Sequence, residues 1–239
     1  MKYPLFHSLI SIPVYIILYI FTALIVILTL LLAGSELKKA LRIVLNFWAR
    51  SLFFIIGKKI HIEGKENILK KKKYILLANH GSLFDIPAIM SLIPDVTWFG
   101  KEYLLNIPFF GKALKMTGYI PMKTANVKNT KLMLKQLVEK SDAGTIAIFP
   151  EGTRTDDGKI LKFHRGFIYL MRASELDVLP VTLNGFYRLK PKTRTAIDFS
   201  TKISVIIHKP LDFQYLEQKN DEEILDVVRS VISSKYLNY

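Results

Sequence analysis

The sequence predicts an α/β protein in which helices flank a mixed, mostly parallel sheet, preceded by an N-terminal membrane-associated helical hairpin. Short apolar runs such as 74–78 and 144–149 recur along the chain, separated by stretches of helical length. Runs with almost no polar residue are typical of strands that are buried on both faces of a sheet. A long uncharged stretch near the N-terminus indicates the hairpin. We therefore expect membrane-anchoring helices in residues 1–58 and an α/β domain in residues 59–239.

Beyond residue 58 the expected elements alternate between strand and helix, and a late hairpin makes the expected sheet mixed. The expected strands are residues 59–63, 74–78, 96–99, 118–122, 144–149 and 178–183, with a hairpin of 196–199 and 203–208. The expected helices are residues 86–92, 126–140 and 166–174, with a last helix that opens at Asp221.

The first apolar stretch, residues 3–35, contains no Lys, Arg, Asp or Glu. A helix needs about 20 apolar residues to cross the hydrocarbon core of a bilayer, and this stretch exceeds that length. A cleaved signal peptide is the alternative, because small residues stand at its end. The apolar part is too long for an ordinary signal peptide, and Lys2 alone is a weak positive region, so we favour a membrane helix.

The next segment, residues 36–56, is amphipathic and basic. Its apolar face is rich in aromatic residues, as expected of a helix that lies at an anionic membrane surface. A core helix of the α/β domain is the alternative. We expect the polar stripe to face anionic lipid; it consists of Lys38, Lys39, Arg42, Asn46 and Arg50.

Charge and cysteine content limit the classes of function. Lys and Arg number 34 against 20 Asp and Glu, a formal net charge of +14. Such an excess favours an anionic partner: lipid headgroups, nucleic acid, or a phosphorylated or acidic substrate. We do not expect nucleic acid, because the aromatic residues lie in apolar runs rather than in a basic groove. Without cysteine there is no disulfide, no thiol nucleophile and no thiolate metal site.

The segment 79–85 follows the apolar run 74–78 and contains His80 and Asp85. Histidine has an unperturbed pKa near neutrality, so it can take a proton from a hydroxyl and return it. A carboxylate on the other ring nitrogen fixes the tautomer and stabilises the imidazolium. On one continuous helix the two side chains would lie roughly 140° apart, so His80 must precede the helix and Asp85 must lie in its first turn. The alternative is that Asp85 only caps the helix.

A second polar loop, residues 149–154, follows the apolar run 144–149. Gly152 permits close approach of the backbone to a ligand, Thr153 offers a hydroxyl, and Arg154 can bind a phosphate through two parallel hydrogen bonds. Taken alone, such a loop is more often a turn closed by a surface pair, here Glu151 and Arg154. Taken with His80, it describes a general base beside an anion-binding loop.

The His-x4-Asp pattern of His80 and Asp85, followed about seventy residues later by Phe-Pro-Glu-Gly-Thr-Arg at 149–154, resembles the glycerolipid acyltransferases. Within that family the resemblance is strongest to the bacterial 1-acyl-sn-glycerol-3-phosphate acyltransferases. Two further blocks, residues 118–123 and 178–185, fit the family pattern, and the resemblance runs from about residue 55 to 210.

The resemblance implies roles for individual residues. It implies that His80 is the catalytic base and that Asp85 orients it. Lys123 stands where the family pattern leads us to expect Arg, and Lys lacks the planar fork of Arg, which puts its share of phosphate binding in doubt. No metal site is implied. The residues that the resemblance assigns to substrate binding are Lys101, Lys123, Glu151, Gly152, Thr153 and Arg154.

The resemblance also implies a reaction and a location. A fatty acyl group would pass from acyl-carrier protein or acyl-CoA to the sn-2 hydroxyl of lysophosphatidic acid, giving phosphatidic acid in phospholipid synthesis. The thioester donor would be a substrate, with no cofactor. The enzyme would lie at the cell inner membrane or plasma membrane, with its active site on the cytoplasmic side. The alternatives are an acyltransferase of the same fold that uses glycerol 3-phosphate or another lysolipid, and a non-catalytic, membrane-attached phospholipid binder.

Overall fold

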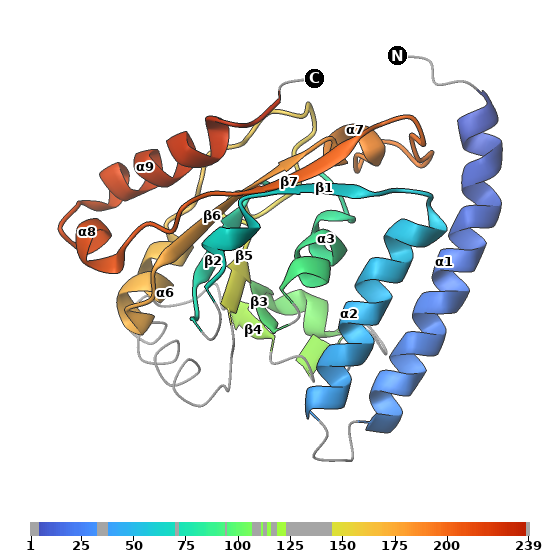
Figure 1. Ribbon diagram of the computed structural model, residues 1–239, viewed down its shortest axis with the longest axis horizontal. Helices are drawn as coiled ribbons and strands as arrows, with labels where there is room; N and C mark the ends of the chain where they lie inside the picture. Colours follow the sequence, from blue (N-terminus) through green and yellow to red (C-terminus); the bar gives the residue numbers. More distant parts are fainter. Residues whose placement is uncertain are drawn as a thin grey trace.

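A computed structural model describes residues 5–32, 38–69, 72–93, 95–106, 111, 114–115, 119–122 and 145–237. Within these ranges the chain forms one seven-stranded sheet with helices on both faces (Figure 1). The strand order is β1-β7-β6-β2-β5-β3-β4. All neighbouring strands are parallel except β6 and β7, so the prediction of a mixed, mostly parallel sheet is confirmed. The strands are β1 (Ile60–Glu63), β2 (Ile75–Ala78), β3 (Val96–Lys101), β4 (Ile120–Met122), β5 (Thr145–Ile148), β6 (Val178–Asn184) and β7 (Ile203–Ile207).

The helices form a layer on each face of the sheet. Helices α2 and α3 lie against one face, and α1 lies outside α2, whereas α6, α8 and α9 lie on the other side (Figure 1). Asn220 opens α9 with a capping box, in which its side chain and that of Glu223 each bind the other residue's backbone N–H. The helices are α1 (Leu5–Leu32), α2 (Lys38–Ile55), α3 (Asp85–Leu92), α6 (Gly166–Ser174), α7 (Phe186–Leu189), α8 (Phe213–Glu217) and α9 (Asp221–Ser233), with 3-10 turns η1 (Lys65–Asn67) and η2 (Glu102–Asn106).

The central strands are buried on both faces, as their apolar runs predict. In β2, Ile75 and Leu77 pack into the cluster beneath α6 and α9. Leu76 and Ala78 point the other way and join the cluster beneath α2 and α3. Successive side chains of a strand point to opposite faces, so one apolar run supplies both halves of the core.

Most predicted elements are confirmed to within a few residues, and one is wrong. Residues 203–207 form β7, but residues 196–199 form no strand, so the predicted hairpin does not exist. Instead, β7 pairs with β6 on one side and with β1 on the other. The predicted helix 126–140 lies outside the described residues.

The segment 195–199 is bound by α1 rather than by a neighbouring strand. Ser11 Oγ accepts a hydrogen bond from the backbone N–H of Ile197 at 2.8 Å, and the Tyr15 hydroxyl donates to the carbonyl of Thr195 at 2.6 Å. The His7 ring stacks on the ring of Phe199. His7, Ser11 and Tyr15 are spaced four residues apart, so they share one face of α1. These polar residues fasten an otherwise apolar helix to the domain.

Residues Phe6–Leu31 of α1 are long and apolar enough to cross a membrane, with a mean hydropathy of 2.8 and 17% of the apolar window buried. The exposed remainder is an apolar surface much larger than soluble monomers ordinarily show. This surface supports membrane association. The division of the chain at residue 58 stays a prediction, and the core cluster beneath α2 runs across that boundary because Phe53 and Ile56 belong to it.

Three residues of the polar stripe of α2 bind the end of α3 and the turn that follows it. Asn46 Nδ2 donates to the carbonyls of Met90 and Ser91 at 2.9 and 3.3 Å. Arg50 Nε donates to the same Ser91 carbonyl at 3.3 Å. An ion pair of 2.9 Å joins Arg42 to Asp95, which lies between α3 and β3. These carbonyls end α3, where no further helical N–H is available to them. The stripe therefore fastens α2 to α3. Asn46 faces α3 and not lipid, whereas Arg50 is exposed and the Arg42 side chain is 40% exposed, so a lipid-facing role stays a prediction for these two. The side chains of Lys38 and Lys39 lie outside the described part of the chain.

This arrangement predicts that Asn46→Ala lowers the free energy of unfolding by about 1–3 kcal/mol, because the carbonyls at the end of α3 lose their donor. Phe47→Ala is the matched control on the adjacent, outward-facing position, since Phe47 is 59% exposed. We expect the control to weaken binding to anionic vesicles while leaving stability nearly unchanged. Thermal melting in detergent and vesicle flotation measure the two effects. Weaker vesicle binding by Asn46→Ala at unchanged stability would instead support a lipid-facing stripe.

Candidate active site

The site lies at one edge of the sheet, where several parallel strands end. The strands β2 and β5 are parallel neighbours with Leu77 opposite Ile148, so the loops that follow them leave the sheet side by side. The strand β6 flanks β2 on the other side in the same direction. Loops at the carboxyl ends of adjacent parallel strands form the binding crevice of α/β proteins. The two polar loops predicted from the sequence therefore meet there.

His80 and Asp85 form a hydrogen-bonded pair. The His80 Nδ1 atom lies 2.8 Å from Asp85 Oδ2, with the carboxylate fully buried and the imidazole 15% exposed. His80 precedes α3 and Asp85 is its first residue, which confirms the predicted geometry. The Oδ2 atom also accepts the backbone N–H groups of Gly81 and Ser82 at 2.7 and 2.8 Å. Asp85 thus both closes the turn and holds the ring, which leaves His80 Nε2 for a substrate proton.

The backbone of His80 is bound to the second loop. Glu151 is 2% exposed, and its Oε1 accepts the N–H of His80 at 2.7 Å. Its Oε2 accepts the N–H of Leu161, also at 2.7 Å. The carbonyl of His80 accepts the N–H of Thr155 at 2.9 Å. Glu151, which the resemblance assigns to substrate binding, therefore points into the protein and joins the two loops.

The His80 ring is also held by stacking. The ring of Phe149 is nearly parallel to it, with centroids 3.8 Å apart, and the indole of Trp98 stacks on Phe149 with centroids 5.2 Å apart. One face of the imidazole is thereby covered, and a carboxylate fixes one ring nitrogen. The base has little rotational freedom, which is what a positioned proton acceptor requires.

The other residues of the second loop lie nearer the surface. Gly152 and Thr153 are exposed, and Arg154 is half-buried. Gly152 adopts a left-handed conformation with φ 67°, and its N–H donates to the carbonyl of Phe149 at 3.0 Å. Glycine suits this turn because other residues are strained at positive φ. The loop thus presents Gly152, Thr153 and Arg154 outward while Glu151 points inward.

Two further candidates predicted from the sequence are Lys101 and Lys123. Lys101 ends β3, a parallel neighbour of β5, so it lies at the same edge of the sheet, and its side chain is exposed. Lys123 follows β4 directly and lies outside the described residues. Within the described part of the chain, Lys101 is not among the contacts that hold His80.

The sequence analysis missed a third segment of the site, α7 and the turn after it. The Ser82 hydroxyl donates to the carbonyl of Lys190 at 2.8 Å, and a Cβ at Gly81 would lie 3.1 Å from Cβ of Tyr187. Asn79 was noted only as part of the first loop. Its side chain exchanges two hydrogen bonds with the backbone of Leu183, at 3.0 and 2.7 Å, and so fixes the end of β2 to β6. The segment has no sequence signal because it joins the catalytic loop through a main-chain carbonyl.

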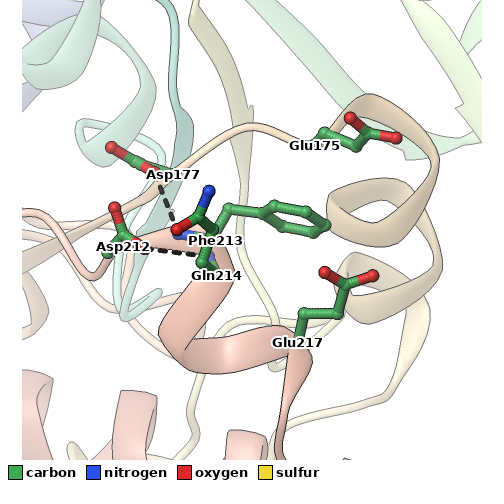
Figure 2. Close-up of a pocket in the computed structure, with 6 residues that line it drawn as sticks. All are labelled: Glu175, Asp177, Asp212, Phe213, Gln214 and Glu217. Atoms are coloured by element: carbon green, nitrogen blue, oxygen red, sulfur yellow. Dashed lines mark hydrogen bonds between the residues drawn. The ribbon is translucent and has the colours of Figure 1, made fainter.

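An acidic pocket opens at a different place (Figure 2). Asp177 precedes β6, so the pocket lies at the opposite edge of the sheet from His80. The Asp177 carboxylate accepts the N–H of Phe213 at 2.9 Å and pairs with Lys72 at 2.6 Å. Asp212 caps α8 through two backbone N–H groups. These carboxylates have structural partners. The lining residues are Glu175, Asp177, Asp212, Phe213, Gln214 and Glu217.

The fold places a hydrogen-bonded pair of a histidine and a buried carboxylate at the edge of an α/β sheet, an arrangement that suits general-base chemistry. Residues 59–184 match the family described as Acyltransferase, and this match covers more than half of the chain. The chain belongs to this acyltransferase family. The family to which the sequence was likened is thereby confirmed.

Named relatives and a solved structure agree with this assignment. A protein named 1-acyl-sn-glycerol-3-phosphate acyltransferase from Borreliella burgdorferi is 30% identical over 186 residues, covering 76% of this chain and 73% of that protein. The chloroplastic 1-acyl-sn-glycerol-3-phosphate acyltransferase LPAT1 of Arabidopsis thaliana is 32% identical over 155 residues, covering 64% of this chain. The chain spans only 44% of the length of the Arabidopsis protein.

The fold matches the crystal structure of the 1-acyl-sn-glycerophosphate acyltransferase PlsC from Thermotoga maritima. The TM-score is 0.79 at 24% sequence identity, and the match covers 95% of each chain. At that identity the likeness concerns the fold alone. It extends over the N-terminal helices as well as the sheet, since it covers nearly the whole chain.

The position of Glu151 generates a prediction about pH. Burial raises its pKa from 4.5 to about 7, although the N–H groups of Leu161 and His80 act in the opposite direction. Because the folded-state pKa exceeds the unfolded value, the stability due to the neutral acid is fully present below about pH 4.5 and is lost as the pH rises through 7. The difference in the free energy of unfolding between the parent and Glu151→Gln should therefore shrink as the pH rises across this range.

Thermal melting of the parent and of Glu151→Gln, at matched pH values on both sides of 7, measures this difference. At low pH we expect the variant to be less stable by about 1–3 kcal/mol, because its NH2 group faces one of the two backbone N–H groups. A gap that widens with pH would contradict the prediction. It would show that the hydrogen bonds to the ionised carboxylate outweigh its desolvation.

Proposed function

We propose that the chain transfers a fatty acyl group from a thioester donor to the sn-2 hydroxyl of lysophosphatidic acid, forming phosphatidic acid. The observation that carries the proposal is the buried pair of His80 and Asp85, 2.8 Å apart, at the same sheet edge as the half-buried Arg154. The first two residues form a base for a hydroxyl, and the third suits a phosphate on the same acceptor. The names of the Borreliella and Arabidopsis relatives support this acceptor.

In the proposed reaction, His80 Nε2 takes the proton of the acceptor hydroxyl as the oxygen attacks the thioester carbonyl. The resulting tetrahedral oxyanion collapses, the C–S bond breaks, and the imidazolium returns the proton to the departing sulfur. Asp85 stabilises the imidazolium through Nδ1–H, while the stacked Phe149 keeps the ring in place. The chain has no cysteine, and the acyl group passes directly to the acceptor without a covalent enzyme intermediate.

The donor is acyl-carrier protein or acyl-CoA, each of which carries negative charge. The net charge of +14 favours the approach of either donor. No cofactor takes part beyond the donor itself. The acceptor keeps its acyl chain in the bilayer, and the exposed apolar surface of α1 holds the domain at the cytoplasmic face of the inner or plasma membrane.

The direct test is to give the purified full chain, in detergent, lysophosphatidic acid and a radiolabelled acyl donor. We expect labelled phosphatidic acid whose label phospholipase A2 releases, since that lipase cleaves the sn-2 ester. Label on glycerol 3-phosphate or on another lysolipid, with none on lysophosphatidic acid, would assign the other acceptor. Binding of phosphorylated lipid without any transfer from either donor would show a non-catalytic binder.

We further predict that Asp85→Asn lowers turnover per folded molecule by about 100-fold or more, because the amide neither fixes the tautomer nor stabilises the imidazolium. Stability should fall as well, since Asp85 Oδ2 also binds Gly81 and Ser82. Active-site titration or the folded fraction from circular dichroism normalises the rate. Lost stability with near-normal turnover per folded molecule would mean that Asp85 only caps α3.

A further inference from the structure

The segment from α7 to Lys192 borders both catalytic loops. Ser82 in the first loop donates to the carbonyl of Lys190 at 2.8 Å. The hydroxyl of Tyr187 donates to the carbonyl of Asp156, just after the second loop, at 2.7 Å, and Lys192 pairs with the Asp156 carboxylate at 3.0 Å. The segment is thus tied to the His80 loop through one residue and to the Arg154 loop through two others.

Two cations of this region lack a carboxylate partner among the described residues. The Lys190 ammonium is half-buried and donates to the carbonyl of Pro191 at 3.0 Å. Arg154 is also half-buried and makes no hydrogen bond or ion pair within the described part of the chain. The two neighbouring cations are engaged elsewhere. Lys192 pairs with Asp156, and Arg194 Nε donates to the carbonyl of Ala196 at 2.8 Å.

The electrostatics of Lys190 agree with this geometry. Burial lowers the pKa of Lys190, and the charges of Arg154 and Arg194 lower it further. Like charges that are partly removed from water repel one another, and the repulsion is relieved when an anion binds between them. A phosphate monoester carries up to two negative charges and several acceptor oxygens, enough for both an ammonium and a guanidinium.

We propose that Lys190 is a phosphate-binding residue that acts with Arg154 on the phosphate of the acceptor. Arg154 supplies the planar fork from the second loop, and Lys190 supplies a point charge from the segment after α7. Because the Lys190 backbone is bonded to Ser82, the phosphate is held at a fixed position relative to His80, two residues away in the first loop. The inference rests on the proposed function, since it assigns a phosphate to the acceptor.

The first experiment measures binding without turnover. Isothermal titration calorimetry with glycerol 3-phosphate compares the parent with Lys190→Gln, which keeps a hydrogen-bond donor but loses the charge. We expect the dissociation constant to rise at least about tenfold, as for loss of one charge-assisted contact. Lys209→Gln is the control. Lys209 is exposed and follows β7, which is antiparallel to β6 and so ends at the opposite edge of the sheet, and its loss should change the dissociation constant by less than about twofold. Equal dissociation constants for parent and Lys190→Gln would overturn the inference.

The second experiment separates the phosphate of the acceptor from those of the donor. In Lys190→Gln we expect KM for lysophosphatidic acid to rise at least about tenfold and KM for acyl-CoA to stay within about twofold. Lys190→Arg should recover most of the acceptor affinity, and its recovery would exclude misfolding as the cause. A rise confined to the donor KM would overturn the inference. If the parent transfers no acyl group, the proposed function is wrong. The role of Lys190 in phosphate binding is then still decided by the calorimetry.

Discussion

The parallel pairing of β2 with β5 and β6 is the constraint on which the site depends. Three loops with little sequence in common leave these strands at one edge, and each contributes a different part of the site. The first carries His80, the second carries Glu151 and Arg154, and the third carries Lys190. Asn79 reinforces the arrangement. Where the backbone pairing of β2 with β6 ends, its side-chain amide continues the hydrogen bonding through two bonds to the backbone of Leu183. Residues that are far apart along the chain are thereby held within hydrogen-bonding distance.

Two buried carboxylates hold different parts of His80: Asp85 holds the ring, and Glu151 holds the backbone. Asp85 binds the ring and its own turn through one oxygen, and Glu151 binds the backbone of His80 and that of Leu161. Burial of a charged carboxylate is costly, and the two N–H groups that Glu151 binds offset only part of that cost, so its pKa is raised. The rigid surroundings suit a base whose nitrogen must lie within hydrogen-bond reach of a substrate hydroxyl. The same bonds explain why a glutamate in an anion-binding loop points inward.

The sequence predicted the parts whose causes are local. Apolar runs marked the buried strands, and the spacing of His80 and Asp85 fixed where α3 begins. The sequence could not show which element packs against the polar face of an amphipathic helix. The period of α2 placed Asn46 on one face, but only the fold shows that this face meets the end of α3. The wrong hairpin has the same origin, since the partner of residues 195–199 is α1, almost two hundred residues away. Glu151 and Lys190 show that a motif does not reveal which way a side chain points, nor contacts made through the main chain.

The most direct test of this account is the effect of His80→Ala on turnover and on acceptor affinity, measured on the same folded preparation. A base contributes to the transition state far more than to binding of the ground state. The account therefore predicts that turnover with lysophosphatidic acid falls by about 100-fold or more, while the dissociation constant for that acceptor changes only a few-fold. Retention of more than about a tenth of the parent rate would contradict the account, because the account assigns the proton transfer to His80 Nε2 alone.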